Sequence, residues 1–249
     1  MSELRLFDCN TRIGPWVDRR PWQFTTTEGL LQEMDRVGIA EALVHSATAS
    51  DHAPAMGNEE LTEQLDGHER LHPCWVLMPH HTGEMDPPEQ LVATMLEQGV
   101  RAARMFPKRH QFLPIQSICG SLLDALAAHK IPLFIDIGET SWGEINDVLG
   151  RHPGLQLIVQ EAFYRIDRYV YPLMERHSGL HLETATYVVH RGIEAVCEQF
   201  GPERLVFGTA MPIRDPGGAI SPITYLRLSD EDKRLIAGDN LRRLLEGVC

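Results

Sequence analysis

The stretch at residues 155–161, LQLIVQE, is an almost unbroken apolar run of strand length that ends in two polar side chains. Such a run is typical of a parallel strand that is covered on both faces. Seven other runs of similar length and character recur along the chain, with helical spacing between them. Together they predict eight strands: Leu4–Asp8, Ala42–Ser46, His72–Met78, Val100–Phe106, Pro132–Asp136, Leu155–Glu161, Leu180–Glu183 and Leu205–Gly208.

The segments between the strands show the spacing of amphipathic helices. Leu30 and Met34 share one face of a helix for which we predict Thr27 as the N-cap. Pro88 suits the first turn of another helix, because the N–H group that it lacks would have no partner there. After the eighth strand, Ser229–Gly247 predicts two helices that pack on the rest of the domain.

Eight strands that alternate with helices predict a (β/α)8 TIM barrel, an α/β fold that typically takes about 250 residues. The chain has 249 residues. A doubly wound open sheet is the rival, but the number of repeats and the lack of a glycine-rich phosphate loop after the first strand count against it. No linker or low-complexity segment interrupts the pattern. We therefore expect one domain that spans residues 1–249.

Composition excludes several classes of protein. The formal net charge of −12 argues against a nucleic-acid partner, because binding to phosphates requires clustered Lys and Arg. No apolar run approaches the roughly 20 residues of a membrane span, and the N-terminus lacks the apolar core of a signal peptide. The five cysteines are scattered and include no C-x-x-C pair, a distribution that argues against a disulfide framework and against a structural zinc site. We expect a cytoplasmic protein with reduced thiols and no membrane partner.

In such a barrel, the side chains at the C-terminal ends of the strands carry the function. Polar residues stand at or just after most of the predicted strand ends. The candidate site residues are Asn10 and Arg12 after the first strand, His45 on the second, His80 after the third, Arg104 on the fourth, Asp136 on the fifth, Glu161 on the sixth and Glu183 on the seventh.

Four segments of the chain are similar to a known family. They are Phe7–Gly14, Gly99–Pro107, Phe200–Pro212 and Ile236–Leu245. In their order and spacing they resemble the amidohydrolase-related family of TIM-barrel metal-dependent hydrolases, over nearly the full length of the chain. The resemblance implies a barrel fold and a hydrolytic activity.

The positions at which this family holds its metal ligands carry other residues here. In the family, the first strand usually ends in Asp-x-His-x-His-x-Gly. Further ligands are a histidine on the fifth strand, a histidine on the sixth and an aspartate on the eighth. The corresponding residues of this chain are Asn10 and Arg12, Asp136, Glu161 (or Gln160 if the alignment shifts by one) and Ala210.

This set of residues argues against a divalent cation. A guanidinium keeps its proton and offers no lone pair to a metal. A divalent cation about 4 Å from Arg12 would meet roughly 8 kcal/mol of repulsion at an effective dielectric near 20. We therefore expect no metal cofactor and hypothesise that Arg12, Asp136 and Glu161 form an ion cluster in its place. A purely structural ion network is the alternative interpretation of the same residues.

The resemblance and these charges together predict a metal-independent hydrolase that acts on a lactone or ester of a small carboxylated substrate. Asp136 or Glu161 would be the general base, with His45 assisting. Arg12 and Arg104 would bind a carboxylate or the developing oxyanion. The other residues of the predicted substrate pocket are Asn10, His80 and Glu183.

Two other functions stay open. The chain could be a catalytically inactive relative that keeps the pocket as a small-ligand-binding or regulatory barrel. It could also be a decarboxylase or lyase, since the family includes such activities, although most of them use the metal. The predicted partner is a small molecule in each case, and a homodimer is compatible with the fold although the sequence identifies no interface.

Overall fold

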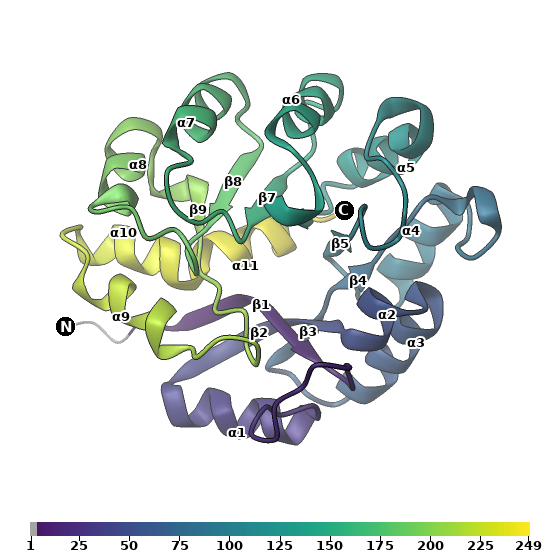
Figure 1. The fold of residues 1–249 in the computed structure, drawn as a ribbon, viewed down its shortest axis with the longest axis horizontal. Helices are drawn as coiled ribbons and strands as arrows, with labels where there is room; N and C mark the ends of the chain where they lie inside the picture. The colour runs from purple at the N-terminus through teal and green to yellow at the C-terminus, as the bar shows by residue number, and fades with distance from the viewer. Residues whose placement is uncertain (1–3) are drawn as a thin grey trace.

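Nine short strands follow one another along residues 4–249, the part of the chain that the computed structural model describes. The strands lie in the middle of the molecule, and most of the helices form a ring outside them (Figure 1). Neighbouring strands pair in parallel. The strands are β1 Leu6–Ile13, β2 Ile39–Ser46, β3 Leu71–Pro73, β4 Trp75–Val76, β5 Ala103–Met105, β6 Leu133–Asp136, β7 Leu157–Gln160, β8 Leu180–Glu183 and β9 Leu205–Val206.

The third predicted strand, His72–Met78, is divided in two in the structure. β3 and β4 are separated by Cys74, whose N–H group donates to the carbonyl of Val44 in β2 at 2.8 Å. β3 is the last strand of a sheet with β1 and β2, and β4 is the first strand of a sheet that continues in order to β9. Because β3 and β4 are successive parts of one strand position, the two sheets join there.

The two ends of this series of strands also meet. The N–H group of Cys9 in β1 donates to the carbonyl of Phe207 at 2.9 Å, and that of Arg12 donates to the carbonyl of Met211 at 3.0 Å. Thr11 and Met211 form a parallel bridge. The residues that follow β9 therefore lie beside β1 and close the ring. The structure thus has the predicted (β/α)8 barrel.

β1 is the strand that differs most from its prediction. It runs to Ile13, whereas the sequence predicted a strand over Leu4–Asp8. All residues of β1 are buried, including the polar Asn10 and Arg12. An apolar run cannot mark this half of the strand, because Asn10, Thr11 and Arg12 are polar and find their hydrogen-bond partners in distant parts of the chain.

Two helices begin where the sequence predicted a helix start, α1 at Thr27 and α4 at Pro88. The N-cap of α1 is Thr26 and not the predicted Thr27, since the Thr26 hydroxyl accepts from the N–H group of Gly29 at 3.2 Å. No helix within residues 4–249 combines the length and the apolar character that crossing a membrane requires. The α-helices are α1 Thr27–Val37, α2 Ala47–Asp51, α3 Pro54–Leu65, α4 Pro88–Glu97, α5 Gln116–Ala128, α6 Trp142–Arg151, α7 Asp167–Arg176, α8 Gly192–Phe200, α9 Gly217–Tyr225, α10 Asp230–Arg234 and α11 Asn240–Glu246, with 3-10 turns at His80–Thr82, Ile137–Glu139 and Pro202–Arg204.

The segment predicted as two helices over Ser229–Gly247 contains α10 and α11, which the structure joins into one helical run. α10 is followed without a break by a π-helical turn, Leu235–Asp239, and then by α11. Leu241 and Leu244 of α11 are buried in the cluster that fills the inside of the barrel, together with Phe7 of β1. α11 thus closes the end of the barrel at which the strands begin.

Side chains inside the barrel form an apolar layer and, nearer the C-terminal ends of the strands, a polar layer. Phe134 on β6 and Ala102 before β5 belong to the apolar cluster of the interior. Because side chains alternate along a strand, the next inward positions lie two residues further on. The polar layer found there is made of Asp136, Arg104, His45 and Gln160.

Candidate functional site

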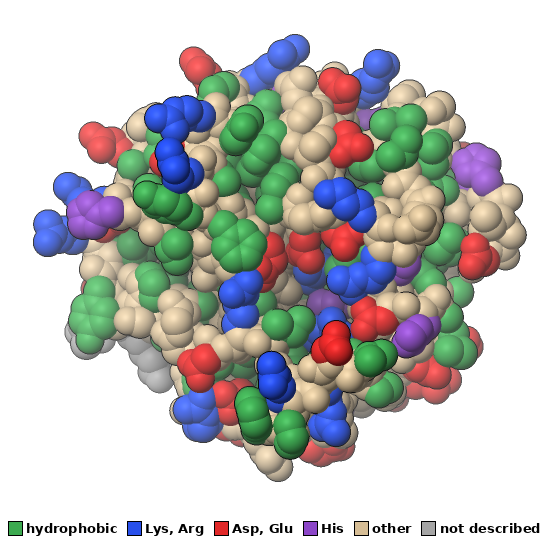
Figure 2. Space-filling model, viewed as in Figure 1, with side chains coloured by type: hydrophobic (Ala, Val, Ile, Leu, Met, Phe, Trp, Pro, Cys, Tyr) green, Lys and Arg blue, Asp and Glu red, His purple; other side chains and the backbone are tan. Residues whose placement is uncertain are grey.

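A cavity of about 140 Å³ lies at the polar layer. Figure 2 shows acidic and basic side chains gathered around the hollow middle of this face. Four arginines and two carboxylates contribute the charges of the lining, and two further carboxylates, Asp51 and Glu139, pair with Arg12 and Arg109 from outside it. The six charged residues of the lining are Arg12, Arg104, Arg109, Arg214, Asp136 and Glu161.

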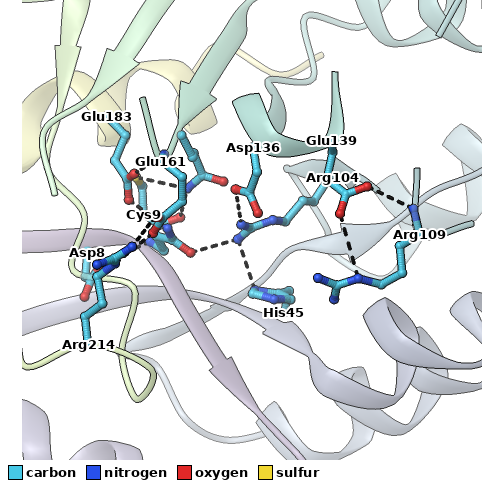
Figure 3. Close-up of polar contacts among 12 residues, drawn as sticks. Asp8, Cys9, His45, Arg104, Arg109, Asp136, Glu139, Glu161, Glu183 and Arg214 are labelled. Carbon is cyan, nitrogen blue, oxygen red and sulfur yellow. Dashed lines mark hydrogen bonds and ion pairs between the residues drawn. The ribbon is translucent and has the colours of Figure 1, made fainter. Parts of the chain in front are cut away.

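The guanidinium of Arg104 lies in the middle of this site (Figure 3). Nη2 donates to Oδ1 of Asp136 at 2.7 Å, and Nη1 donates to Oδ1 of Asn10 at 2.9 Å. Only 4% of Arg104 is exposed. Burial lowers the pKa of Arg104, but the charges of Asp136, Cys74 and Glu183 and the hydrogen bond to Asp136 together outweigh burial, and the net shift is upward. The guanidinium is therefore a fixed positive charge.

His45 on β2 is a third neighbour of this guanidinium. Nη1 of Arg104 lies 3.3 Å from Nδ1 of His45. A guanidinium has only donors, so Nδ1 must accept and the ring proton belongs on Nε2. Burial, followed by the positive charges of Arg104 and Arg12, holds the pKa of His45 well below its usual value. His45 is thus a neutral imidazole whose Nδ1 lone pair is already used.

Glu161 and Arg214 form a two-point ion pair on one side of the cavity. Nη2 and Nε of Arg214 donate to the two carboxylate oxygens of Glu161 at 2.6 and 3.2 Å. Glu161 has a φ of 54°, in the left-handed region that non-glycine residues seldom occupy. Its backbone N–H donates to Oε2 of Glu183 at 3.2 Å, which helps to hold this conformation. Such strained positions cluster at functional sites.

Arg12 has a different partner from the predicted one. Its Nη2 donates to Oδ2 of Asp51 at 3.0 Å, and the other oxygen of Asp51 accepts from Arg109 at 2.7 Å. The predicted cluster of Arg12 with Asp136 and Glu161 is therefore wrong, although all three line the cavity. The reason is the position of α2, which follows β2 directly and brings Asp51 to Arg12.

Two carboxyl groups are buried behind the cavity, on Asp8 and Glu183, and neither is exposed to solvent. Asp8 accepts hydrogen bonds from the backbone N–H groups of Asn10 and Thr209, both at 2.9 Å, and from the Thr209 hydroxyl. Burial raises the pKa of Asp8 to about 7 and that of Glu183 to about 8.

Asn10 connects these buried groups to Arg104. Its Nδ2 donates to Oε1 of Glu183 at 2.8 Å, while its Oδ1 accepts from Arg104. Because Arg104 can only donate, the amide of Asn10 has one permitted orientation, and Glu183 must accept from it. The chain Glu183–Asn10–Arg104–Asp136 therefore fixes the direction of the guanidinium.

The structure places His80 outside the cavity. His80 lies in the 3-10 turn at His80–Thr82, where its ring centroid is 4.3 Å from that of His81. It borders a separate surface hollow beside α4 and α5. The candidate residues that line the cavity or contact its lining directly are Asn10, Arg12, His45, Arg104, Asp136, Glu161 and Glu183.

Three charged residues of the site were not among the candidates: Arg109, Arg214 and Asp51. Arg214 follows Pro212 by two residues, in the loop after the eighth strand, and that position was a usable signal. Arg109 lies in a short basic run, Lys108–His110, that follows the fourth predicted strand. Asp51 ends the short helix α2, and no local pattern connects it to Arg12.

No group of three or more His, Cys, Asp or Glu side chains within residues 4–249 is arranged to hold a metal ion. At the centre of the cavity the groups that could bind a metal ion are the amide oxygen of Asn10, the imidazole of His45 and the carboxylate of Asp136. All three already contact the guanidinium of Arg104.

The Glu183 side chain packs directly against Gly208, where there is no room for a Cβ atom. A substitution at Gly208 therefore tests whether Glu183 is held in this position. A Cβ at Gly208 would lie 2.3 Å from Oε1 and 2.9 Å from Cδ of Glu183. Glu183 cannot move away easily, because Asn10 and the Glu161 N–H group hold both its oxygens. We expect Gly208→Ala to lower the free energy of unfolding by about 1–3 kcal/mol, measured by urea denaturation.

The matched control for this substitution is Gly218→Ala. Gly218 lies in α9, and a Cβ there would meet no atom within 4 Å. Alanine has the higher helix propensity, so Gly218→Ala should leave stability unchanged or raise it by up to about 1 kcal/mol. Equal stabilities of the two variants would show that Glu183 is not held in the described position.

A family model described as amidohydrolase matches residues 76–247 of the chain. A search of curated proteins finds no match.

Solved structures match the chain over nearly its whole length. An uncharacterised TIM-barrel protein from Bordetella bronchiseptica has a TM-score of 0.79 at 17% sequence identity, over 98% of this chain and 99% of that one. A 5-carboxyvanillate decarboxylase from Novosphingobium aromaticivorans, with bound manganese, has a TM-score of 0.75 at 11% identity, over 98% and 97%. A probable 2-pyrone-4,6-dicarboxylic acid hydrolase from Acinetobacter baumannii, with citric acid bound, has a TM-score of 0.69 at 10% identity, over 98% and 100%. At such identities the likeness concerns the fold.

Proposed function

This chain belongs to the amidohydrolase family, and from that premise we propose that its cavity binds a small carboxylated molecule and hydrolyses an ester or lactone bond in it without a divalent cation. The position of Arg104 carries this proposal. Its buried guanidinium contacts Asn10, His45 and Asp136 at 2.9, 3.3 and 2.7 Å. By the family resemblance, Asn10 and Asp136 stand at positions of metal ligands.

The residues present do not fit a divalent cation of the kind that the manganese-containing decarboxylase holds. A cation among Asn10, His45 and Asp136 would have to displace Arg104 or lie beside it. Displacement would break the buried pair with Asp136, and proximity would bring strong repulsion. In this proposal Arg104 supplies the positive charge.

A carboxylated substrate is favoured by the four arginines that line the cavity. The guanidinium of arginine matches a carboxylate in shape and charge. Arg109 and Arg214 are 39% and 42% exposed in their side chains, so both can be reached by an entering molecule. The names of the two relatives, a carboxyvanillate decarboxylase and a pyrone-dicarboxylic acid hydrolase, also denote carboxylated compounds.

The chemical step needs a base and a group that stabilises an oxyanion. Arg104 is fixed on three sides before the substrate arrives, which is the condition under which a cation stabilises a developing oxyanion well. Asp136 or Glu161 would take a proton from the attacking water. Arg12, held by Asp51, would help to bind the substrate.

The proposal is tested by a screen of small carboxylated lactones and esters with chelator-treated protein. We expect turnover that survives chelation and falls about 100-fold in Asp136→Asn, because a base or its charge is lost. Arg12→Met should mainly raise KM, since it removes a cation from the lining and leaves the base in place. Hydroxybenzoates belong in the same screen, so that decarboxylation would be detected.

The control for Asp136→Asn is Asp147→Asn, the same substitution at an exposed position of α6. It should keep full activity. Turnover that disappears with the chelator and returns with manganese would contradict the metal-free proposal.

A binding function without catalysis is the second candidate. It is favoured by one observation, that both carboxylates lining the cavity are already paired with guanidinium groups. Binding of small carboxylates without turnover across the whole screen would support this function over hydrolysis.

A further inference from the structure

The two carboxylates of the cavity are held by arginines that differ in accessibility. Arg104, the partner of Asp136, has a side chain that is 5% exposed, whereas that of Arg214, the partner of Glu161, is 42% exposed. A half-exposed ion pair is weak and exchanges readily, while a buried one is held by the lack of any alternative partner. Of the two arginines, Arg214 is therefore the one to which an entering anion can bind in place of its present carboxylate partner.

Glu161 is masked as a base while Arg214 holds it. Both of its carboxylate oxygens accept from the guanidinium, at 2.6 and 3.2 Å. The backbone of Glu161 is anchored independently, through the N–H group that donates to Glu183. When the guanidinium leaves, the carboxylate of Glu161 thus stays at the cavity with its oxygens free.

Arg214 has the freedom that such an exchange needs. Its backbone is fixed, because its N–H group donates to the carbonyl of Ala210 at 3.1 Å. The guanidinium lies over the ring of Phe163, 5.3 Å from its centroid, and that ring is itself about half exposed. Rotation about the side-chain bonds can turn the guanidinium from Glu161 to a ligand without movement of the loop.

We propose that a carboxylate of the substrate replaces Glu161 at Arg214, so that substrate binding itself releases Glu161 to act as the base. The binding step stands on the ion pairs alone, and the chemical step rests on the proposed hydrolysis. Free Glu161 takes a proton from water as the water oxygen bonds to the ester carbonyl carbon. The oxyanion then collapses, the bond to the alkoxide breaks, and the alkoxide takes the proton from Glu161.

Binding of malonate, measured by thermal-shift titration at constant ionic strength, tests the exchange. Glu161→Gln should bind malonate about 5-fold more tightly than the wild type, because Arg214 no longer has a competing anion. Arg214→Gln should bind about 10-fold more weakly, because a charge-assisted hydrogen bond is lost. The matched control is Glu33→Gln, which breaks an exposed Glu–Arg pair on α1 and should leave binding unchanged.

Malonate binding by Glu161→Gln that equals or falls below the wild type would overturn the exchange. Where a hydrolysed ester is found, the same variant should lower both kcat and KM, a combination that a structural role of Glu161 does not produce. Tighter malonate binding together with no hydrolysis in any screen would support the exchange and reject the proposed function.

Discussion

Arg104→Met is expected to lower the free energy of unfolding by about 3–5 kcal/mol and to abolish carboxylate binding in the cavity. Arg104 is 4% exposed, and its guanidinium is the partner of Asp136. Methionine leaves that carboxylate without a partner, and leaves Oδ1 of Asn10 without its donor. Urea denaturation measures the loss of stability, and malonate titration of the folded variant measures the loss of binding.

The control for this substitution is Arg36→Met on α1. Arg36 also pairs with a carboxylate, Glu33 at 2.6 Å, but its side chain is 60% exposed. Removal of a surface pair of this kind changes stability by less than about 1 kcal/mol. Arg104→Lys should fall between the two methionine variants, because lysine keeps the charge but cannot reach Asn10 and Asp136 with a planar fork. Equal losses in Arg104→Met and Arg36→Met would contradict the central role given to Arg104.

The contribution of Asp8 and Glu183 to stability should decrease as the pH rises from 5 to 8, because both carboxyl groups are buried. Burial raises the pKa of Asp8 from 3.8 to about 7, and that of Glu183 from 4.5 to about 8. Between these limits the two carboxyl groups bind more protons in the folded protein than in the unfolded chain. The stabilisation is complete below about pH 4 and is lost as the pH rises through the folded-state pKa.

Asp8→Asn isolates the contribution of one of these groups. One pKa unit corresponds to about 1.4 kcal/mol, so Asp8 should account for a loss of about 3 kcal/mol between pH 5 and pH 7. The difference in unfolding free energy between wild type and Asp8→Asn should therefore shrink by that amount, as measured by urea denaturation at each pH. Asp147→Asn, an exposed control on α6, should differ from the wild type equally at every pH. A difference between Asp8→Asn and the wild type that does not vary with pH would show that the Asp8 carboxyl does not titrate in this range.

Local patterns in the sequence predicted most of the barrel. β6, β7 and β8 lie within predicted runs, because a strand covered on both faces needs apolar side chains at both sets of alternate positions. The same runs show where strands end. For this reason Arg104 and Asp136 were predicted at one end of the barrel, and both line the cavity there.

The length of a strand depends on its neighbours as well as on its own sequence. The run at His72–Met78 predicted a strand that would bring His80 to the mouth of the barrel. β4 ends at Val76, where it pairs with Arg104 of β5, and the chain then turns away before His80. An apolar run marks burial and cannot distinguish a paired strand residue from a buried loop residue.

The apolar periodicity of the chain determined the barrel and the end of it at which polar side chains gather. The pairing of each arginine with a particular carboxylate was decided only by the tertiary structure. Arg12 stands level with His45 of β2 and is reached by Asp51, whereas Asp136 lies on the strand next to that of Arg104. Such pairs join residues more than 30 positions apart, and an ion pair requires its atoms within a few ångströms. Strand register and barrel closure set those distances. The burial of Asp8 inside the closed barrel is likewise a property of the folded chain, and it raises the pKa of that carboxyl group.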